Sequence, residues 1–108
     1  MESPAPDEDP AVMLKRNAEF DRPVIAAVHG AAVGGGMELT LACDLVVAAD
    51  SAWFCMPELG HGVIPNTGLA LLSRVIGLRR ASELILTRRR VSAQEALDFS
   101  NADKQWIL

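Results

Sequence analysis

The chain has 108 residues, the usual size of one domain. Half of them are hydrophobic and the mean hydropathy is +0.20, which is high for a small free-standing domain and fits a piece of a larger core. The formal net charge of -4 and the pI of about 5.0 argue against a general nucleic-acid binder, because phosphate contacts need a basic face.

Residues 1–10, "MESPAPDEDP", predict a disordered acidic and proline-rich leader, because they have neither the basic start nor the apolar run of a signal peptide. Leu14 and Ala18 lie one helical turn apart, so a short helix is expected next. The apolar run Val24–Val28 predicts a strand buried on both faces, as in a parallel sheet. Three glycines then separate this strand from a helix expected from about Gly36 to Cys43.

A second apolar run, Leu45–Ala49, completes a βαβ-like unit with a short crossover, and "AWFC" predicts a brief further strand. Prolines and glycines between residues 57 and 68 predict a loop. Two helices should follow, in "LALLSRVIG" with a glycine stop at Gly77 and in "RRASELIL". The spacing of Ser92 and Glu95 is that of a capping box. No internal repeat is visible.

The remaining composition points to an intracellular protein. Cys43 and Cys55 have no metal-site spacing and are expected to be reduced, buried thiols, with the cytoplasm favoured over the mitochondrion. Residues 23–41 are apolar enough to imitate a membrane span, but His29, Glu38 and the glycines interrupt them, so no span is expected. Six of the ten basic residues predict a solvated helix-and-turn surface, with anion binding as the alternative: Arg74, Arg79, Arg80, Arg88, Arg89 and Arg90.

The stretch "VGGGMELTLACD", residues 33–44, has the features of a helix start that binds a developing negative charge. A helix start offers N–H groups without intrahelical partners and about half a positive charge. The stretch lacks GxGxxG, the Lys-Ser or Lys-Thr of a P-loop, and GxSxG. What remains is a glycine-lined N–H pocket for a carbonyl oxygen that becomes negative, with Glu38 one helical step away.

The next carboxylate in the chain is Glu58, after one predicted strand and a turn that could return the chain to the same edge of the sheet. In an apolar surround the two carboxylates would ionise unequally, so that one accepts a proton and the other donates one. Each also has an ordinary explanation, because Glu38 suits a first helical turn and Glu58 suits a loop surface.

The sequence resembles the enoyl-CoA hydratase, or crotonase, superfamily from about Arg22 to Leu97. The resemblance rests on "PVIAAVHGAAVGGGMELTLACDLVVAA", "PELGHGVIPNTG" and "ELILT". It implies a partial crotonase-like α/β fold of stacked ββα units over residues 11–97, a divergent tail over 98–108, and homo-oligomers that are trimers or dimers of trimers.

The resemblance also implies chemistry on acyl-CoA thioesters, with no metal or prosthetic group because the thioester supplies the electron sink. Hydratases of the family add water across the 2,3 double bond, using two backbone N–H groups as an oxyanion hole and two glutamates that position one water. Carried over by position, these roles fall on Gly35 for one N–H and on Glu38 and Glu58 for catalysis, while Val33, Gly34, Pro57 and Asn66 would line the acyl site.

The chain departs from the family pattern in several places. Asn66 and Leu69 replace smaller residues, His29 stands where Asn is common and is expected to be structural, and Arg88 replaces the usual glycine after "LT". The tail "DFSNADKQWIL" does not resemble the next family strand. Family members are more than twice this length, and the other oxyanion N–H and most of the CoA-binding surface belong to an upstream part, so a shortened form with doubtful activity is expected.

Two alternatives to a hydratase stay open. An isomerase of the same superfamily often lacks one of the two carboxylates, so the presence of both Glu38 and Glu58 favours hydration. A noncatalytic fragment that associates with full-length subunits through an exposed sheet edge is the alternative of a different class.

Overall fold

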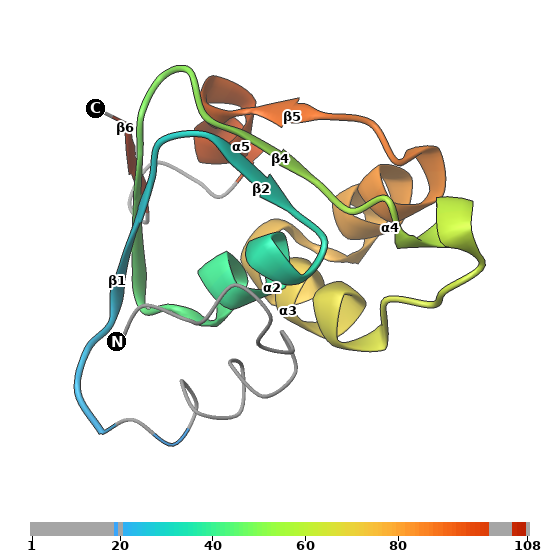
Figure 1. Ribbon diagram of the computed structural model, residues 1–108, viewed down its shortest axis with the longest axis horizontal. Coiled ribbons are helices and arrows are strands. Elements are labelled where there is room, and N and C mark those ends of the chain that lie inside the picture. Colours follow the sequence, from blue (N-terminus) through green and yellow to red (C-terminus); the bar gives the residue numbers. More distant parts are fainter. Residues whose placement is uncertain (1–18, 20, 100–104, 108) are drawn as a thin grey trace.

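The computed structural model describes residues 19, 21–99 and 105–107 (Figure 1). The leader expected over residues 1–10 and the helix expected around Leu14 and Ala18 lie outside the described residues. Among the helices described, none is long and apolar enough to cross a membrane.

Two three-stranded sheets form the scaffold. The first has the order β1-β3-β6 and is parallel throughout, with strands β1 (Ile25–Val28), β3 (Leu45–Ala48) and β6 (Gln105–Ile107). The second has the order β2-β4-β5, with strands β2 (Ala31–Val33), β4 (Trp53–Cys55) and β5 (Val91–Ser92). In this sheet β2 and β4 are parallel, whereas β4 and β5 are antiparallel.

The chain repeats one structural unit, in which it passes through a strand of each sheet and then into a helix. The first unit is β1, β2 and α2 (Gly35–Ala42), and the second is β3, β4, the 3-10 helix η1 (Glu58–His61) and α3 (Asn66–Ile76). This confirms the expected stacked ββα units. The two units share the order of their strands and the path of the chain rather than their residues. This is why the sequence shows no internal repeat.

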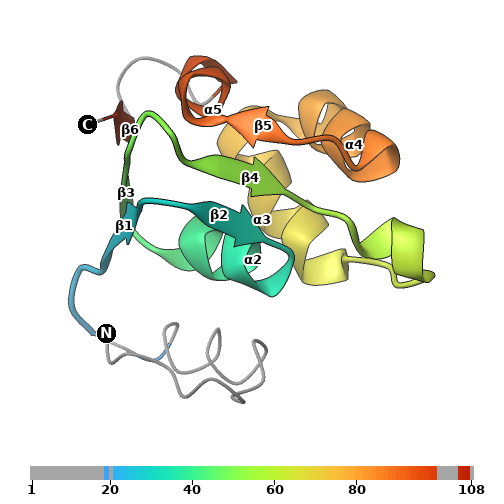
Figure 2. The same cartoon turned by 45° about the horizontal axis from the view of Figure 1, so that its top comes forward.

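The hydrophobic core lies between the second sheet and the helices. In Figure 2, α2 and α3 lie along one face of β2 and β4, and the chain continues into α4 (Leu78–Thr87) and α5 (Ala93–Phe99). Gly77, with φ 89°, ends α3 and begins α4, as its position in the sequence predicted. Buried side chains from both ββα units and from α4 join in this core, among them Met37, Phe54, Met56, Leu72 and Leu84.

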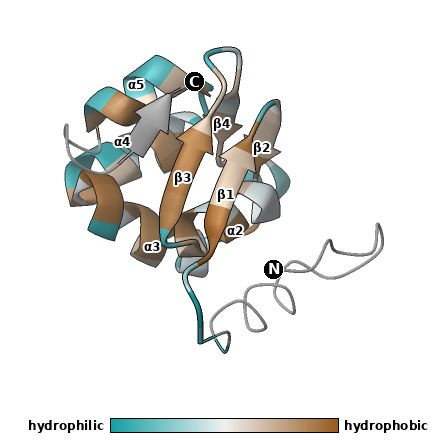
Figure 3. Cartoon of the chain, turned by 90° about the vertical axis from the view of Figure 1, so that its left-hand side faces the viewer, coloured by the Kyte–Doolittle hydropathy of each residue, from teal (hydrophilic) through white to brown (hydrophobic). Residues whose placement is uncertain are grey.

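The outer face of the first sheet is apolar and exposed, contrary to the prediction that Val24–Val28 is buried on both faces. Ile25 is 60% exposed and its register partner Leu45 is 45% exposed. Figure 3 views this face and shows the hydrophobic colouring of β3 beside β1. The reason for the difference is that no described element packs on this face, and β1 forms an edge of the sheet in the described part of the chain.

The local patterns located most elements but missed some. No strand was predicted at β2, because three residues between Gly30 and Gly34 are too few to show a period. The expected loop after Pro57 contains η1, and α3 begins at Asn66, before the apolar period starts. In the tail, for which no element was predicted, α5 continues to Phe99 and β6 pairs with β3.

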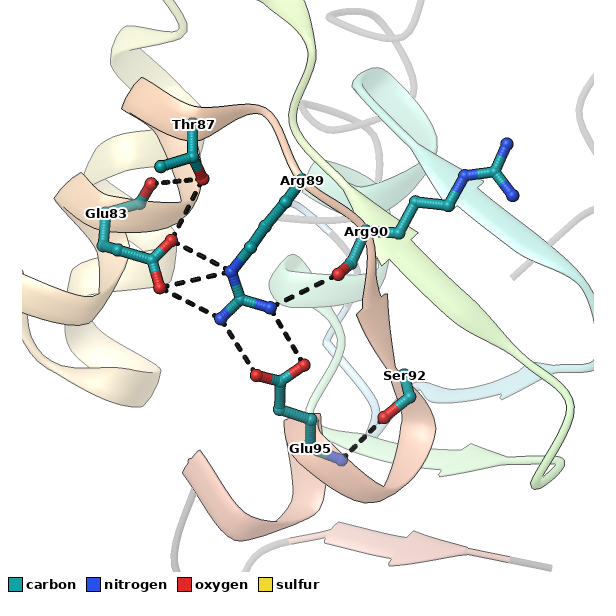
Figure 4. Close-up of polar contacts among 6 residues, drawn as sticks. All are labelled: Glu83, Thr87, Arg89, Arg90, Ser92 and Glu95. Atoms are coloured by element: carbon teal, nitrogen blue, oxygen red, sulfur yellow. Dashed lines mark hydrogen bonds and ion pairs between the residues drawn. The ribbon is translucent and has the colours of Figure 1, made fainter.

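The arginines after α4 tie several elements together. Figure 4 shows the Arg89 guanidinium between two carboxylates: it donates to Glu83 of α4 at 3.0 Å and to Glu95 of α5 at 2.9 Å. The Ser92 hydroxyl accepts the Glu95 N–H at 3.1 Å, so the predicted cap is present, although the Glu95 carboxylate binds Arg89. Arg90 stacks on the Trp53 ring at 4.0 Å. Five of the six arginines are exposed as expected, whereas Arg89 is half-buried and carries these structural contacts.

Replacing Arg89 by Met should destabilise the fold, because it leaves Glu83 and Glu95 facing each other across α4 and α5 without their shared cation. We expect a small decrease in the free energy of unfolding, since the side chains are largely solvated but act as a network. Urea denaturation measures it, with Arg79→Met on the exposed surface as the control. Equal effects of the two substitutions would contradict the network.

Candidate active site

The turn before α2 places a glycine directly against Glu58. Gly34 has φ 57° and ψ -118°, a conformation that strongly favours glycine. Its N–H donates to the Cys55 carbonyl at 2.9 Å, which ties the turn to the end of β4. A Cβ at Gly34 would lie 3.4 Å from Glu58 Oε1. The backbone conformation therefore favours glycine here, and the Glu58 carboxylate lies in van der Waals reach of the turn.

Gly35 is the first residue of α2, so its N–H has no acceptor within the helix. The positive end of the helix dipole lies at the same place. The neighbouring Gly36 is exposed, and a Cβ there would meet nothing within 4 Å. This N-terminus of α2 thus combines an available N–H with open space beside it.

Glu38 lies in the first turn of α2 and is half-buried. Burial and, second, the nearby Glu58 carboxylate raise the pKa of Glu38, while a hydrogen bond from the backbone of Gly68 in α3 partly lowers it. The two glutamates are therefore close enough for their charges to repel, although two strands, β3 and β4, separate them along the chain.

Glu58 is the first residue of η1, and one of its carboxylate oxygens lacks a hydrogen-bond partner. Oε1 is buried and, within the described part of the chain, accepts no hydrogen bond. A buried polar atom without a partner is rare, and it often marks a position that acts in chemistry or binds a molecule. Because Oε1 faces Gly34, this free acceptor lies beside the N-terminus of α2.

The other predicted residues surround this arrangement less closely. Val33 ends β2 and is 38% exposed, and Pro57 is half-buried directly before Glu58. Asn66 is exposed at the start of α3, where its N–H donates to the Ile64 carbonyl at 2.9 Å. The structure therefore brings Gly34, Glu38 and Glu58 together. Asn66 lies two residues before Gly68, which is the point where α3 contacts Glu38.

Sequence reasoning missed that contact point, Gly68. A Cβ there would lie 2.6 Å from Met56 Cε, so the end of the Met56 side chain would have to shift, and 3.5 Å from Glu38 Cγ, an ordinary contact distance. Met56 is 1% exposed and directly precedes Pro57 and Glu58. The only feature of the sequence at this position is a glycine three residues after Pro65. Such a glycine is common near a helix start, so it did not indicate a contact with Glu38 or Met56.

A separate interior space of about 420 Å³ lies on the other side of α2. Most of the described side chains that line it are apolar, including Met37, Leu41, Leu72 and Phe99, and neither glutamate is among them. This space belongs to the packing between α2, α3 and α5. The chemistry of the two carboxylates lies elsewhere.

Removing the charge of Glu38 should stabilise the chain at neutral pH. The pKa of Glu38 in the folded protein lies above the ordinary value of 4.5 that applies to the unfolded chain. Between the unfolded-state pKa and the folded-state pKa, the folded protein therefore binds more protons than the unfolded one. Stability therefore falls as pH rises through this window, and the penalty is complete above it. We expect Glu38→Gln to be more stable by under about 1 kcal/mol at pH 7, with solvent screening limiting the effect.

Urea denaturation of both proteins between pH 4 and pH 8 measures this difference. The advantage of Glu38→Gln should disappear below pH 4.5, where the wild-type carboxyl is protonated in both states. An advantage that is constant across the pH range would show that the substitution acts by packing alone.

Comparison with known proteins identifies the family. Residues 8–100 match the profile described as enoyl-CoA hydratase/isomerase. The chain is 45% identical over 88 residues to a probable enoyl-CoA hydratase of Bacillus subtilis, which covers 81% of this chain and 34% of that protein. It is 46% identical over 80 residues to a carnitinyl-CoA dehydratase of Salmonella paratyphi B, covering 73% of this chain and 31% of the relative.

Solved structures agree with the sequence matches. An enoyl-CoA hydratase from Bacillus anthracis superposes with a TM-score of 0.81 at 39% identity, over 92% of this chain and 39% of that one. A probable enoyl-CoA hydratase/isomerase from Mycobacterium abscessus gives a TM-score of 0.80 at 38% identity, over 91% and 38% of the two chains. The sequence spans about a third of the length of the curated relatives that it matches. The profile match and these superpositions show that the chain has a partial crotonase-like α/β fold and belongs to the enoyl-CoA hydratase/isomerase family.

Proposed function

We propose that this chain carries the two catalytic carboxylates of an enoyl-CoA hydratase, which adds water across the 2,3 double bond of an acyl-CoA thioester. The observation that carries the proposal is the buried, unpartnered Oε1 of Glu58, which faces the Gly34 turn beside the half-buried Glu38. A free acceptor at this place suits a water molecule held for reaction.

In this mechanism one water lies between Glu38 and Glu58. Its oxygen bonds to Cβ of the trans-2-enoyl thioester while one glutamate accepts the water proton and the other delivers a proton to Cα. The raised pKa of Glu38 supports this division of roles between proton donor and proton acceptor. Two nearby carboxyl groups that ionise unequally can be present at one pH as one protonated acid and one ionised carboxylate. The overall change adds H and OH and needs no oxidant or reductant.

The N–H of Gly35 would stabilise the negative charge that develops on the thioester oxygen. A donor fixed at a helix N-terminus needs no reorganisation during the reaction, which is the main source of such stabilisation. The thioester is itself the electron sink, so the proposed reaction needs no metal or prosthetic group; coenzyme A is part of the substrate. Val33, Gly34, Pro57 and Asn66 would line the acyl site.

The test is hydration of crotonyl-CoA, followed by loss of the enoyl absorbance. The assay uses a chimera in which this sequence replaces the matched third of the Bacillus subtilis relative, so that the flanking segments of that protein are present. Hydration dependent on both glutamates is the expected result. Migration of the double bond without hydration would assign an isomerase instead.

A second role is favoured by the exposed apolar face of β1 and β3. Ile25 and Leu45 lie side by side on it, and in the described part of the chain β1 is an edge strand of four apolar residues without a charge. Unprotected edges of this kind associate with other chains. The chain would then dock on subunits of its own family, whose expected homo-oligomers are trimers or dimers of trimers.

The 108-residue chain should therefore self-associate in solution. Light scattering on the purified chain is expected to give a mass above that of a monomer. Ala27→Lys, which adds a charge in the middle of the edge strand, should shift the mass towards the monomer, whereas Ala70→Lys on the exposed side of α3 should not. A monomeric wild-type chain would remove this role.

A further inference from the structure

Arg88 is the one non-glycine residue with positive φ in the described part of the chain, at φ 57°. It follows α4, and its N–H caps the helix by donating to the Leu84 carbonyl at 2.9 Å. A glycine would adopt this left-handed conformation without strain. An arginine at this position therefore needs a reason in its side chain.

The Arg88 side chain lies on η1 against Gly60. A Cβ at Gly60 would lie 2.6 Å from Nη1, 3.4 Å from Cδ and 3.6 Å from Cζ of Arg88. Gly60 does not have a positive φ, so its backbone does not demand glycine. The space that its missing side chain leaves is filled by the guanidinium. The two departures from ordinary residue choice, a strained arginine and an unforced glycine, thus explain each other.

Arg88 also contacts the chain on the other side of Glu58. The Cys55 thiol donates to the Arg88 carbonyl at 3.3 Å. Cys55 lies three residues before Glu58, and Gly60 lies two residues after it. One residue at the end of α4 therefore holds both flanks of the segment that carries Glu58.

The neighbouring arginines contact other elements of the fold. Arg89 is fixed between Glu83 and Glu95, and Arg90 is stacked on Trp53 of β4. The backbone that presents Arg88 is thereby anchored to α4, α5 and β4. Within the described residues Arg88 forms no ion pair. The contact of its guanidinium with Gly60 of η1 is therefore the interaction that accounts for its position.

We infer that Arg88 is a positioning residue that clamps the Cys55–Gly60 segment and so fixes the direction of the Glu58 carboxylate. The inference rests on the proposed function for the role of Glu58, but the clamp itself is a matter of geometry. The hollow next to it is lined by Pro57, Gly60, His61, Thr87 and Arg88, so it lies between η1 and the end of α4.

Amide hydrogen exchange on the 108-residue chain tests the clamp without any assay of activity. Arg88→Gly relieves the strained conformation, so the thermal midpoint should stay equal or rise. The amides of η1 should nevertheless exchange at least about tenfold faster, because loss of the Arg88 contact lowers the free energy of local opening that protects them. The reporters are Gly60, Gly62 and Val63, which donate to Pro57, Leu59 and Glu58.

Two further variants make the result decisive. Gly60→Ala should displace the guanidinium and loosen the same amides, and in the Arg88→Gly background it should add no further effect, because its collision partner is gone. The ¹³C resonance of the Glu58 carboxyl should move in both single variants and stay in place in Arg79→Ala. If Arg88 is only a helix cap, Arg88→Gly will leave η1 exchange and the Glu58 resonance unchanged, which would overturn the inference.

Discussion

Replacing either Glu38 or Glu58 by Gln should lower kcat for hydration of crotonyl-CoA by about 10² to 10⁴, the usual contribution of a general acid or base. Glutamine keeps the size and polarity of the side chain but can neither accept nor deliver the proton. KM should change little, since neither carboxylate is proposed to bind the CoA portion. The measurement is steady-state kinetics of the chimera with the Bacillus subtilis relative.

Glu19→Gln provides the matched control, because Glu19 is exposed and lies before the first strand. It should leave kcat unchanged. A drop of less than threefold in both Glu38→Gln and Glu58→Gln would remove the pair from the mechanism. Circular dichroism of each variant separates lost chemistry from lost folding. Glu38→Gln is expected to fold at least as well as wild type, because it removes the cost of burying the charge and the repulsion with Glu58.

Gly35→Pro should lower kcat in the same chimera by about 10² to 10³, because an oxyanion donor contributes about 2.7 to 4 kcal/mol in the transition state. Proline removes the N–H while suiting the first position of a helix, which Gly35 occupies. The effect should fall on kcat more than on KM, since the negative charge develops only during the reaction.

Gly36→Ala is the control for this substitution. A Cβ at Gly36 meets nothing within 4 Å, so alanine should be accepted with near-normal turnover. Near-normal turnover in Gly35→Pro as well would refute the role of this N–H. A loss in both variants with an altered circular dichroism spectrum would instead show that the turn tolerates no substitution.

The sequence predicted the parts of the fold that depend on local pattern. The strand ending at Val28, the helix after the glycines and the stop at Gly77 follow from apolar periods and glycine conformations, which act within a few residues. The exposure of Ile25 did not follow, because an apolar run reports the environment a strand suits and says nothing of which elements cover it.

The candidate site was predicted through a resemblance, and the structure adds its physical detail. Spacing alone left Glu38 and Glu58 as possible surface residues, since their approach depends on how β3 and β4 return the chain. The contacts of Gly68 with Glu38 and of Arg88 with Gly60 join residues far apart in the sequence. Such contacts have no local signature, so each glycine looked like ordinary turn chemistry.

The central claim is that Glu38 and Glu58 act on one water, and the double variant tests it most directly. If both carboxylates serve the same proton transfers, Glu38→Gln combined with Glu58→Gln in the chimera should be no slower than the worse single variant by more than about threefold, since residues that act as a unit are strongly non-additive. The measurement is kcat for crotonyl-CoA hydration in the wild type, both single variants and the double variant. Losses that multiply across the two sites would contradict the account, because each glutamate would then act independently of the other.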